Sequence, residues 1–293
     1  MIPAAFAYAR PTSLADALEQ LAPSGAGASG GGVKVLSGGQ SLIPLLRLRL
    51  ASADKLVDIG GLSELRNIRE LPDGGLGIGA TVTYREVLDS ALATARAPLL
   101  ALAISGIGDV QVRNRGTLGG SIAHADPASD LPAIALALDA TLAVRSGNGE
   151  RTVAAADFFQ GAFATALGEG ELLTEIRIPA QPAGTGMAYR RLEQRASGYS
   201  IVGVAAVVAR SGGSVTRARV AITGVGDVAY RAAGVESALV GSAGDADAIA
   251  AAAAHAVDGV TVASDIHAGA EYRAEMARVH TRRAIEAALA AGD

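Results

Sequence analysis

The chain has 293 residues, half of them hydrophobic, a formal net charge of -4 at pH 7 and no cysteine. This length and apolar content exclude an intrinsically disordered chain and suit one large domain or two to three small ones. Scattered basic residues exclude the electrostatic surface of a nucleic-acid-binding protein. The lack of thiols excludes disulfides, zinc ribbons and iron–sulfur ligation within this sequence.

The sequence also bears on location. It contains no uninterrupted apolar run of about 18 residues, and its first residues, MIPAAFAYARPTS, lack the basic n-region of a signal peptide. We therefore expect a cytoplasmic protein with no transmembrane segment and no nucleic-acid partner. An attachment to the inner face of the membrane through partner chains is compatible with this expectation.

In chain order, residues 1–178 alternate between strand and helix patterns. Apolar residues at spacings of three and four predict helices at 14–22, from 42 onward, 84–92, 97–105 and 131–138. Short apolar runs bounded by turn residues predict strands at 33–37, 55–60, 65–70, 74–82, 141–146, 150–155 and 171–178. Clustered glycines predict loops at 24–32 and 112–130.

Capping residues mark where several of these helices begin. Ser41 and Thr83 are expected N-caps, and Ser129 and Asp130 are expected to cap the helix that follows them. The strand at 33–37 (VKVLS) is expected to be buried.

The proline- and glycine-rich segment 179–186 (PAQPAGTG) is the predicted domain boundary. We expect domains at 1–178, with subdomains at about 1–55 and 56–178, and at 179–293. In the second domain three strands precede three helices, predicted at 187–192, 201–209, 215–223, 232–240, 246–256 and 272–291. This order favours an α+β domain whose helices pack on one side of an antiparallel sheet.

Two short glycine motifs carry the clearest chemical signal. We call residues 37–41 (SGGQS) the first motif and residues 117–121 (TLGGS) the second motif. A phosphate ester against protein needs several donors, and backbone N–H groups reach it where no Cβ keeps it away. Two such loops suit a pyrophosphate, although either motif alone is more simply interpreted as a tight turn.

Neither motif matches a common phosphate fingerprint. The sequence has no G-x-x-x-x-G-K-S/T, which disfavours P-loop hydrolysis. Residues 224–229 (GVGDVA) have the form G-x-G-x-x-A after a strand. Because no acidic strand end follows within a βαβ unit, we interpret them as a turn and not as a Rossmann loop.

Three further features leave alternatives open. His124, beside Asp126, is interpreted as a residue that orders the loop or contacts a ligand, because no G-x-S-x-G motif supports a hydrolase base. Arg113 and Arg115 either neutralise a phosphate or form surface salt bridges. Tyr199, just ahead of an apolar strand, either stacks on a planar ligand or packs in the core.

Taken together, LSGGQSLIPLLRLRL, QVRNRGTLGGSIAHADPASDLP and TRRAIEAA resemble one family. The chain is similar, over essentially its whole length, to the FAD-binding medium subunits of the molybdenum hydroxylases, the xanthine dehydrogenase superfamily. The flavoprotein subunits of aerobic carbon monoxide dehydrogenase are the branch it resembles most. The resemblance implies a vanillyl-alcohol-oxidase-type (PCMH-type) FAD-binding domain of two α/β subdomains. A carbon-monoxide-dehydrogenase-flavoprotein-like C-terminal domain, a small antiparallel sheet with helices, would follow.

The resemblance also implies the residues that hold FAD. The two motifs would wrap the pyrophosphate with amides and hydroxyls, and Asp130 would contact the flavin nucleotide. Leu172 or Leu173 would contact the flavin ring, and Tyr199 would cover one face of that ring. Relatives often have an acidic residue where this chain has Gly198. The implied cofactor residues are Leu36, Ser37, Gly38, Gly39, Gln40, Ser41, Leu42, Asn114, Thr117, Leu118, Gly119, Gly120, Ser121, His124, Asp130, Leu172 and Tyr199. No catalytic residue and no metal ligand is expected.

The family places the remaining cofactors on other chains. The resemblance implies a large subunit with the molybdenum cofactor, a small subunit with 2Fe–2S clusters, a dimer of heterotrimers, and an external electron acceptor such as a quinone. The alternatives are the medium subunit of a purine, N-heterocycle or aldehyde hydroxylase, a stand-alone FAD oxidase, and a partner-binding protein that has lost FAD.

Overall fold

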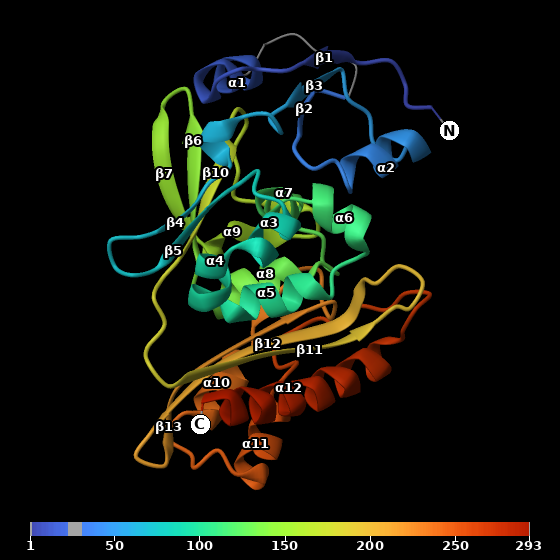
Figure 1. Cartoon of the computed structure of the whole chain (residues 1–293). Helices are drawn as coiled ribbons and strands as arrows, with labels where there is room; N and C mark the ends of the chain where they lie inside the picture. The colour runs from blue at the N-terminus through green and yellow to red at the C-terminus, as the bar shows by residue number, and fades with distance from the viewer. Residues whose placement is uncertain (1, 23–30, 293) are drawn as a thin grey trace.

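The computed structural model describes residues 2–22 and 31–292, arranged as three stacked layers (Figure 1). A small parallel sheet with two helices lies at one end. A larger antiparallel sheet with a group of helices lies in the middle, and a third sheet backed by a long helix lies at the other end. The loop expected at 24–32 falls mostly outside the described residues.

The first layer is a three-stranded parallel sheet in the order β1-β3-β2. One face of α1 packs on it through Leu14, Ala17 and Leu21, which are buried. Its elements are β1 (Ala7–Ala9), α1 (Leu14–Leu21), β2 (Val33–Leu36), α2 (Leu42–Leu48), β3 (Lys55–Asp58) and the 3-10 turn η1 (Ser63–Leu65).

Two expectations change in this layer. The prediction that β2 is buried is wrong. Val33 and Lys34 are exposed because β2 is an edge strand. The central strand β3 begins at residue 55. The subdomain boundary expected at about 55 therefore falls inside this sheet.

The second layer is a five-stranded antiparallel sheet in the order β4-β5-β10-β6-β7, with helices grouped beside it (Figure 1). Helix α8 is buried along its whole length because it lies between this layer and the third sheet. The elements are β4 (Ile68–Glu70), β5 (Leu76–Gly79), α3 (Tyr84–Asp89), α4 (Ala91–Arg96), α5 (Pro98–Ser105), α6 (Val110–Arg115), α7 (Leu118–His124), α8 (Asp130–Ala137), β6 (Thr141–Ser146), β7 (Gly149–Ala154), α9 (Ala155–Phe158), β8 (Phe159–Gly161), β9 (Ala164–Thr165) and β10 (Leu172–Ile178).

Helix boundaries in this layer differ from prediction at two places. Thr83 caps α3 through a capping box with Glu86, as predicted, but the helix expected to continue to residue 92 breaks at Ser90, whose side chain caps α4. The stretch 112–130, expected as a loop, contains the end of α6 and all of α7. It is helical because the Thr117 hydroxyl accepts the N–H of Gly120 and caps α7.

The third layer is an antiparallel sheet in the order β11-β12-β13-β14. Helices α5 and α8 of the second layer pack on one face and α12 packs on the other (Figure 1). The elements are β11 (Thr185–Glu193), β12 (Ser200–Ser211), β13 (Ser214–Thr223), β14 (Tyr230–Arg231), α10 (Ala233–Leu239), α11 (Ala246–Ala253) and α12 (Ala270–Gly292).

The helices of this domain, α10, α11 and α12, share one core with one face of the sheet, as predicted, and α5 and α8 of the second layer cover the other face. Ala205 and Val207 of β12 join the core of the second layer, whereas Val204 and Ala206 join the core under α12. The double burial explains why β12 is a continuous apolar run with no alternation of polar residues. The helices of both domains therefore meet across one shared sheet.

The remaining predictions for the C-terminal half are confirmed at the level of element type and order. Residues 224–229 form a turn between β13 and β14, as interpreted from the sequence. Within residues 2–22 and 31–292, no helix is long and apolar enough to cross a membrane.

Candidate functional site

The two glycine motifs lie against each other. The hydroxyl oxygens of Ser37 and Thr117, 80 residues apart in sequence, are 2.9 Å apart and share a hydrogen bond. A Cβ added to Gly38 would lie 2.2 Å from the carbonyl oxygen of Arg115 and 3.0 Å from the Cα of Gly116. Only glycine permits this approach of the two chains, so Gly38 holds the motifs at contact distance.

The first motif presents backbone N–H groups that the protein does not use. The motif joins β2 to α2 and has Gly39 at φ +75°, a backbone region that glycine adopts without strain. Among the described residues, the N–H groups of Gly38, Gly39, Gln40 and Ser41 donate no hydrogen bond. Ser41 is at the N-cap position of α2, but the expected capping bond from its side chain is absent. The turn therefore offers several donors to an anion.

The second motif has a different construction, because the N–H groups of residues 118–121 are bonded within the protein. Gly119 donates to the carbonyl oxygen of Ala80 at 3.0 Å, and Ser121 donates to that of Thr117 at 3.1 Å. The N–H of Gly120 donates to the Thr117 hydroxyl. A Cβ at Gly119 would lie 2.5 Å from the Cβ of Ala80. The second motif thus packs tightly into the core and supports the first, and a ligand would meet its side chains rather than its amides.

Tyr199 reaches the first motif from the third layer. It lies in the turn between β11 and β12, next to Gly198 at φ +72°, and is 45% exposed. Its phenol lies near the side chain of Ser41. Burial and then the charge of Asp126 raise the pKa of Tyr199 overall, although the interaction with Ser41 lowers it, so the phenol stays protonated at neutral pH. The ring lies at the edge of the motifs and not in the core.

Asp130 is buried directly behind the second motif, with only 5% of its surface exposed. Its Oδ1 accepts hydrogen bonds from the hydroxyls of Tyr189 and Ser200, and its Oδ2 accepts one from Arg191 at 2.8 Å. Burial raises the pKa of Asp130, although Arg191 opposes the shift. Ser129 occupies the N-cap position of α8 as predicted but makes no side-chain capping bond, and Asp130 bonds to the third layer instead.

Two further side chains adjoin the second motif. His124 ends α7, and its ring centroid lies 5.1 Å from that of Phe163. Burial lowers the pKa of His124, while Asp126 opposes the shift. Tyr84, which the sequence reasoning missed, is buried near Ser121, and burial raises its pKa to about 12. Its place in the first turn of α3 gave no signal of this contact.

The remaining predicted residues differ in exposure and packing. Leu172 is buried in the core under the first layer, with Leu62 and Leu65. Asn114 is exposed on α6, and Leu118 is buried. Leu36 and Leu42 pack against a small core next to α2, and Gln40 is exposed. The structure therefore brings together both motifs and Tyr199, but not Leu172.

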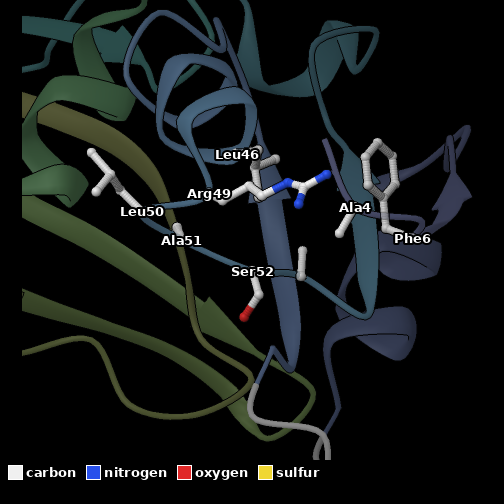
Figure 2. Close-up of a pocket in the computed structure, with 8 residues that line it drawn as sticks. Ala4, Phe6, Leu46, Arg49, Leu50, Ala51 and Ser52 are labelled. Atoms are coloured by element: carbon white, nitrogen blue, oxygen red, sulfur yellow. The ribbon is translucent and has the colours of Figure 1, made fainter. Parts of the chain in front are cut away.

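A surface hollow lies at the C-terminal end of α2 (Figure 2). It contains none of the predicted cofactor residues. Its lining residues are Ala4, Phe6, Leu46, Arg49, Leu50, Ala51, Ser52 and Ala53. Figure 2 shows Arg49 extending across the hollow towards Ala4 and Phe6.

The site fits a flavin nucleotide in two respects. Free N–H groups on a glycine turn suit the phosphates, and an exposed tyrosine beside them suits a planar ring. Fold and site thus define a nucleotide-cofactor-binding protein of mixed α and β structure.

Residues 4–181 match the FAD binding domain in molybdopterin dehydrogenase, and residues 187–288 match the CO dehydrogenase flavoprotein C-terminal domain. The chain belongs to the FAD-binding medium subunits of the molybdenum hydroxylases and is an oxidoreductase subunit.

Full-length relatives agree with this assignment. The carbon monoxide dehydrogenase medium chain of Hydrogenophaga pseudoflava is 41% identical, with 99% of both chains covered. The 6-hydroxypseudooxynicotine dehydrogenase complex subunit alpha of Paenarthrobacter nicotinovorans is 37% identical, with 99% of this chain and 96% of the relative covered. A chain of reconstituted CO dehydrogenase from Oligotropha carboxidovorans superposes with a TM-score of 0.94 at 39% identity, covering 99% of this chain and 100% of that one. The family and fold class expected from the sequence are confirmed.

Proposed function

We propose that this chain binds FAD and serves as the electron-transfer subunit of a molybdenum–iron–sulfur hydroxylase. The observation that carries the proposal is the row of unbonded N–H groups from Gly38 to Ser41, held against the second motif and beside the exposed Tyr199. In the proposal, electrons arrive from 2Fe–2S clusters on a partner chain and leave to an external acceptor such as a quinone. The flavin supplies the redox chemistry when bound, and this chain positions and shields it.

Each part of the site contacts a different part of FAD in this proposal. The first motif donates its N–H groups to the pyrophosphate, because four consecutive amides there, at residues 38–41, donate to no described residue. Thr117 and Ser121 present hydroxyls on the facing side. Tyr199 lies over the flavin ring, and neutral His124 lines the end of α7 without adding a charge. No residue of this chain is assigned a catalytic proton transfer.

The proposal extends to domains and assembly. A division at residue 178 is supported by the end of β10 at Ile178 and the start of β11, in a different sheet, at Thr185. Partner chains are supported by the relatives, which are named as a medium chain and as a subunit of a complex. We propose a cytoplasmic dimer of heterotrimers with a large molybdenum subunit and a small iron–sulfur subunit.

For the holoenzyme we propose carbon monoxide oxidation, supported by the 41% identity to a carbon monoxide dehydrogenase medium chain. An N-heterocycle hydroxylase is the second candidate, because a relative from a 6-hydroxypseudooxynicotine dehydrogenase complex is 37% identical. The substrate pocket is expected on the large subunit, so the two candidates share every feature of this chain.

Purification of the chain with its co-expressed partner subunits tests the proposal. We expect one FAD per chain and reduction of that flavin by carbon monoxide under anaerobic conditions. Flavin reduction by an N-heterocycle but not by carbon monoxide would select the second candidate. Absence of flavin from the complex would refute the assignment of FAD to this chain.

A further inference from the structure

A buried ion pair connects the cofactor site to the third layer. Asp130 is the first residue of α8 in the second layer, and its three hydrogen-bond donors, Tyr189, Arg191 and Ser200, lie on β11 and β12. The partners lie 59 to 70 positions further along the chain. With both oxygens bonded to the protein and 5% exposure, this carboxylate is not directed towards the motifs. It joins the two domains just behind the second motif.

Arg191 also donates hydrogen bonds to groups other than Asp130. Its Nη1 donates to Asp130 and also, at 3.2 Å, to the carbonyl oxygen of Gly198. Its Nη2 donates to the carbonyl oxygen of Gly106, at the end of α5, and to Glu193. One planar guanidinium therefore fixes the start of α8, the end of α5 and the turn before Tyr199 relative to one another.

The turn that receives this contact is short and closed. We call residues 194–199 the Tyr199 turn. The N–H of Gln194 donates to the carbonyl oxygen of Tyr199, and the N–H of Gly198 donates to that of Gln194, both at 2.8 Å. Because these bonds make the turn compact, a contact at Gly198 sets the position of the neighbouring ring. That ring reaches Ser41 of the first motif.

We propose that Asp130 and Arg191 are positioning residues that hold Tyr199 over the first motif, in place of a direct contact between Asp130 and the flavin. The inference rests on the proposed function, since it states how the flavin cover is kept in place. Asp130 orients the guanidinium, and the guanidinium holds the turn. Loss of either should free Tyr199 without removing any donor from the first motif.

A second ion-pair group at the same junction supplies the matched control. Asp139, after α8, accepts from Arg217 at 2.7 Å, from Arg219 at 2.9 Å and from Arg231 at 2.8 Å, all on the third layer. None of these four residues contacts the Tyr199 turn in the described structure. Asp139→Asn therefore weakens the contact between the second and third layers but leaves the hydrogen bonds of Asp130 and Arg191 in place.

The test measures the fluorescence of the bound flavin in the purified complex, because a stacked tyrosine quenches it. Asp130→Asn keeps the shape of the side chain but removes its charge. Arg191→Lys keeps a positive charge beside Asp130 but lacks the planar fork that reaches the two carbonyls. We expect both variants to retain one FAD per chain and to fluoresce about fivefold more than wild type, the population change that corresponds to about 1 kcal/mol. Asp139→Asn should match wild type, and Tyr199→Ala should match the two positioning variants.

Two outcomes decide against the inference. Loss of FAD in Asp130→Asn with full FAD in Arg191→Lys would make Asp130 a direct ligand. Wild-type fluorescence in both positioning variants, with a rise in Tyr199→Ala, would show that the pair does not hold the turn. If Asp130→Asn does not fold, Arg191→Lys decides alone. A wild-type complex without flavin would instead overturn the proposed function, so the two failures are distinguishable.

Discussion

Gly38 is the residue whose substitution should most directly separate the two motifs. In Gly38→Ala the new Cβ would lie 2.2 Å from the carbonyl oxygen of Arg115, an atom of the backbone that no rotamer change can move away. Overpacking costs about 1–3 kcal/mol, and a clash with backbone belongs at the upper end, about 3 kcal/mol. If the motifs part to relieve it, the hydrogen bond between Ser37 and Thr117 is lost as well.

We expect this change to weaken FAD binding about 100-fold, since each 1.4 kcal/mol is a factor of about ten. The assay is titration of the deflavinated complex with FAD, followed by quenching of flavin fluorescence. Gly147→Ala is the matched control, because Gly147 lies in an exposed turn with nothing within 4 Å of an added Cβ. Wild-type affinity in a folded Gly38→Ala complex would refute the inference that close contact of the motifs builds the site.

Three further predictions concern stability and protonation. Thr117→Val removes the cap of α7 and should lower the free energy of unfolding by about 1 kcal/mol in urea titrations, whereas Thr117→Ser should restore it; equal stability of both variants would contradict the capping role. Burial alone would raise the pKa of Asp139, but hydrogen bonds from Arg219 and Arg217 lower it overall. The ionised carboxylate therefore stabilises the folded protein above about pH 4, and this stabilisation is lost as the pH falls through the lowered pKa of the folded state. Asp139→Asn should therefore flatten the acid limb of a stability profile, and an unchanged limb would count against the network. Burial lowers the pKa of His124, so an NMR titration should find its ring neutral down to below about pH 6.5, and a titration at the ordinary value would show that the ring is not buried.

Much of the fold could be predicted because local patterns and tertiary packing agree. Thr83 with Glu86 begins α3 by a capping box that is readable from spacing alone. The apolar run of β12 is readable as a strand, but its burial on both faces depends on helices from another layer. The exposure of β2 could not be predicted, since only the strand order puts it at an edge.

The second motif shows where composition misleads. Adjacent glycines predict a loop because each costs a helix about 1 kcal/mol relative to alanine. Here the helix forms nevertheless, because Thr117 caps it and Gly119 permits close contact with Ala80. Glycine is needed at position 119 for packing, which a one-dimensional sequence cannot reveal.

The candidate site was only partly predictable for the same reason. Both motifs stand out by their glycines and hydroxyls, and the structure brings Ser37 and Thr117 together. The hydrogen-bond partners of Asp130 come from strands more than 50 residues away, so no local sequence pattern predicts them. Leu172 lies in the core of the first layer, a position set by tertiary packing alone.

FAD binding by this chain can be measured on the assembled complex after removal of its flavin. We expect FAD to restore one flavin per chain together with electron transfer from the substrate to a quinone, and we expect Gly38→Ala to prevent both at the same FAD concentration. Electron transfer to the quinone by a complex that carries no flavin on this chain would contradict the proposed function.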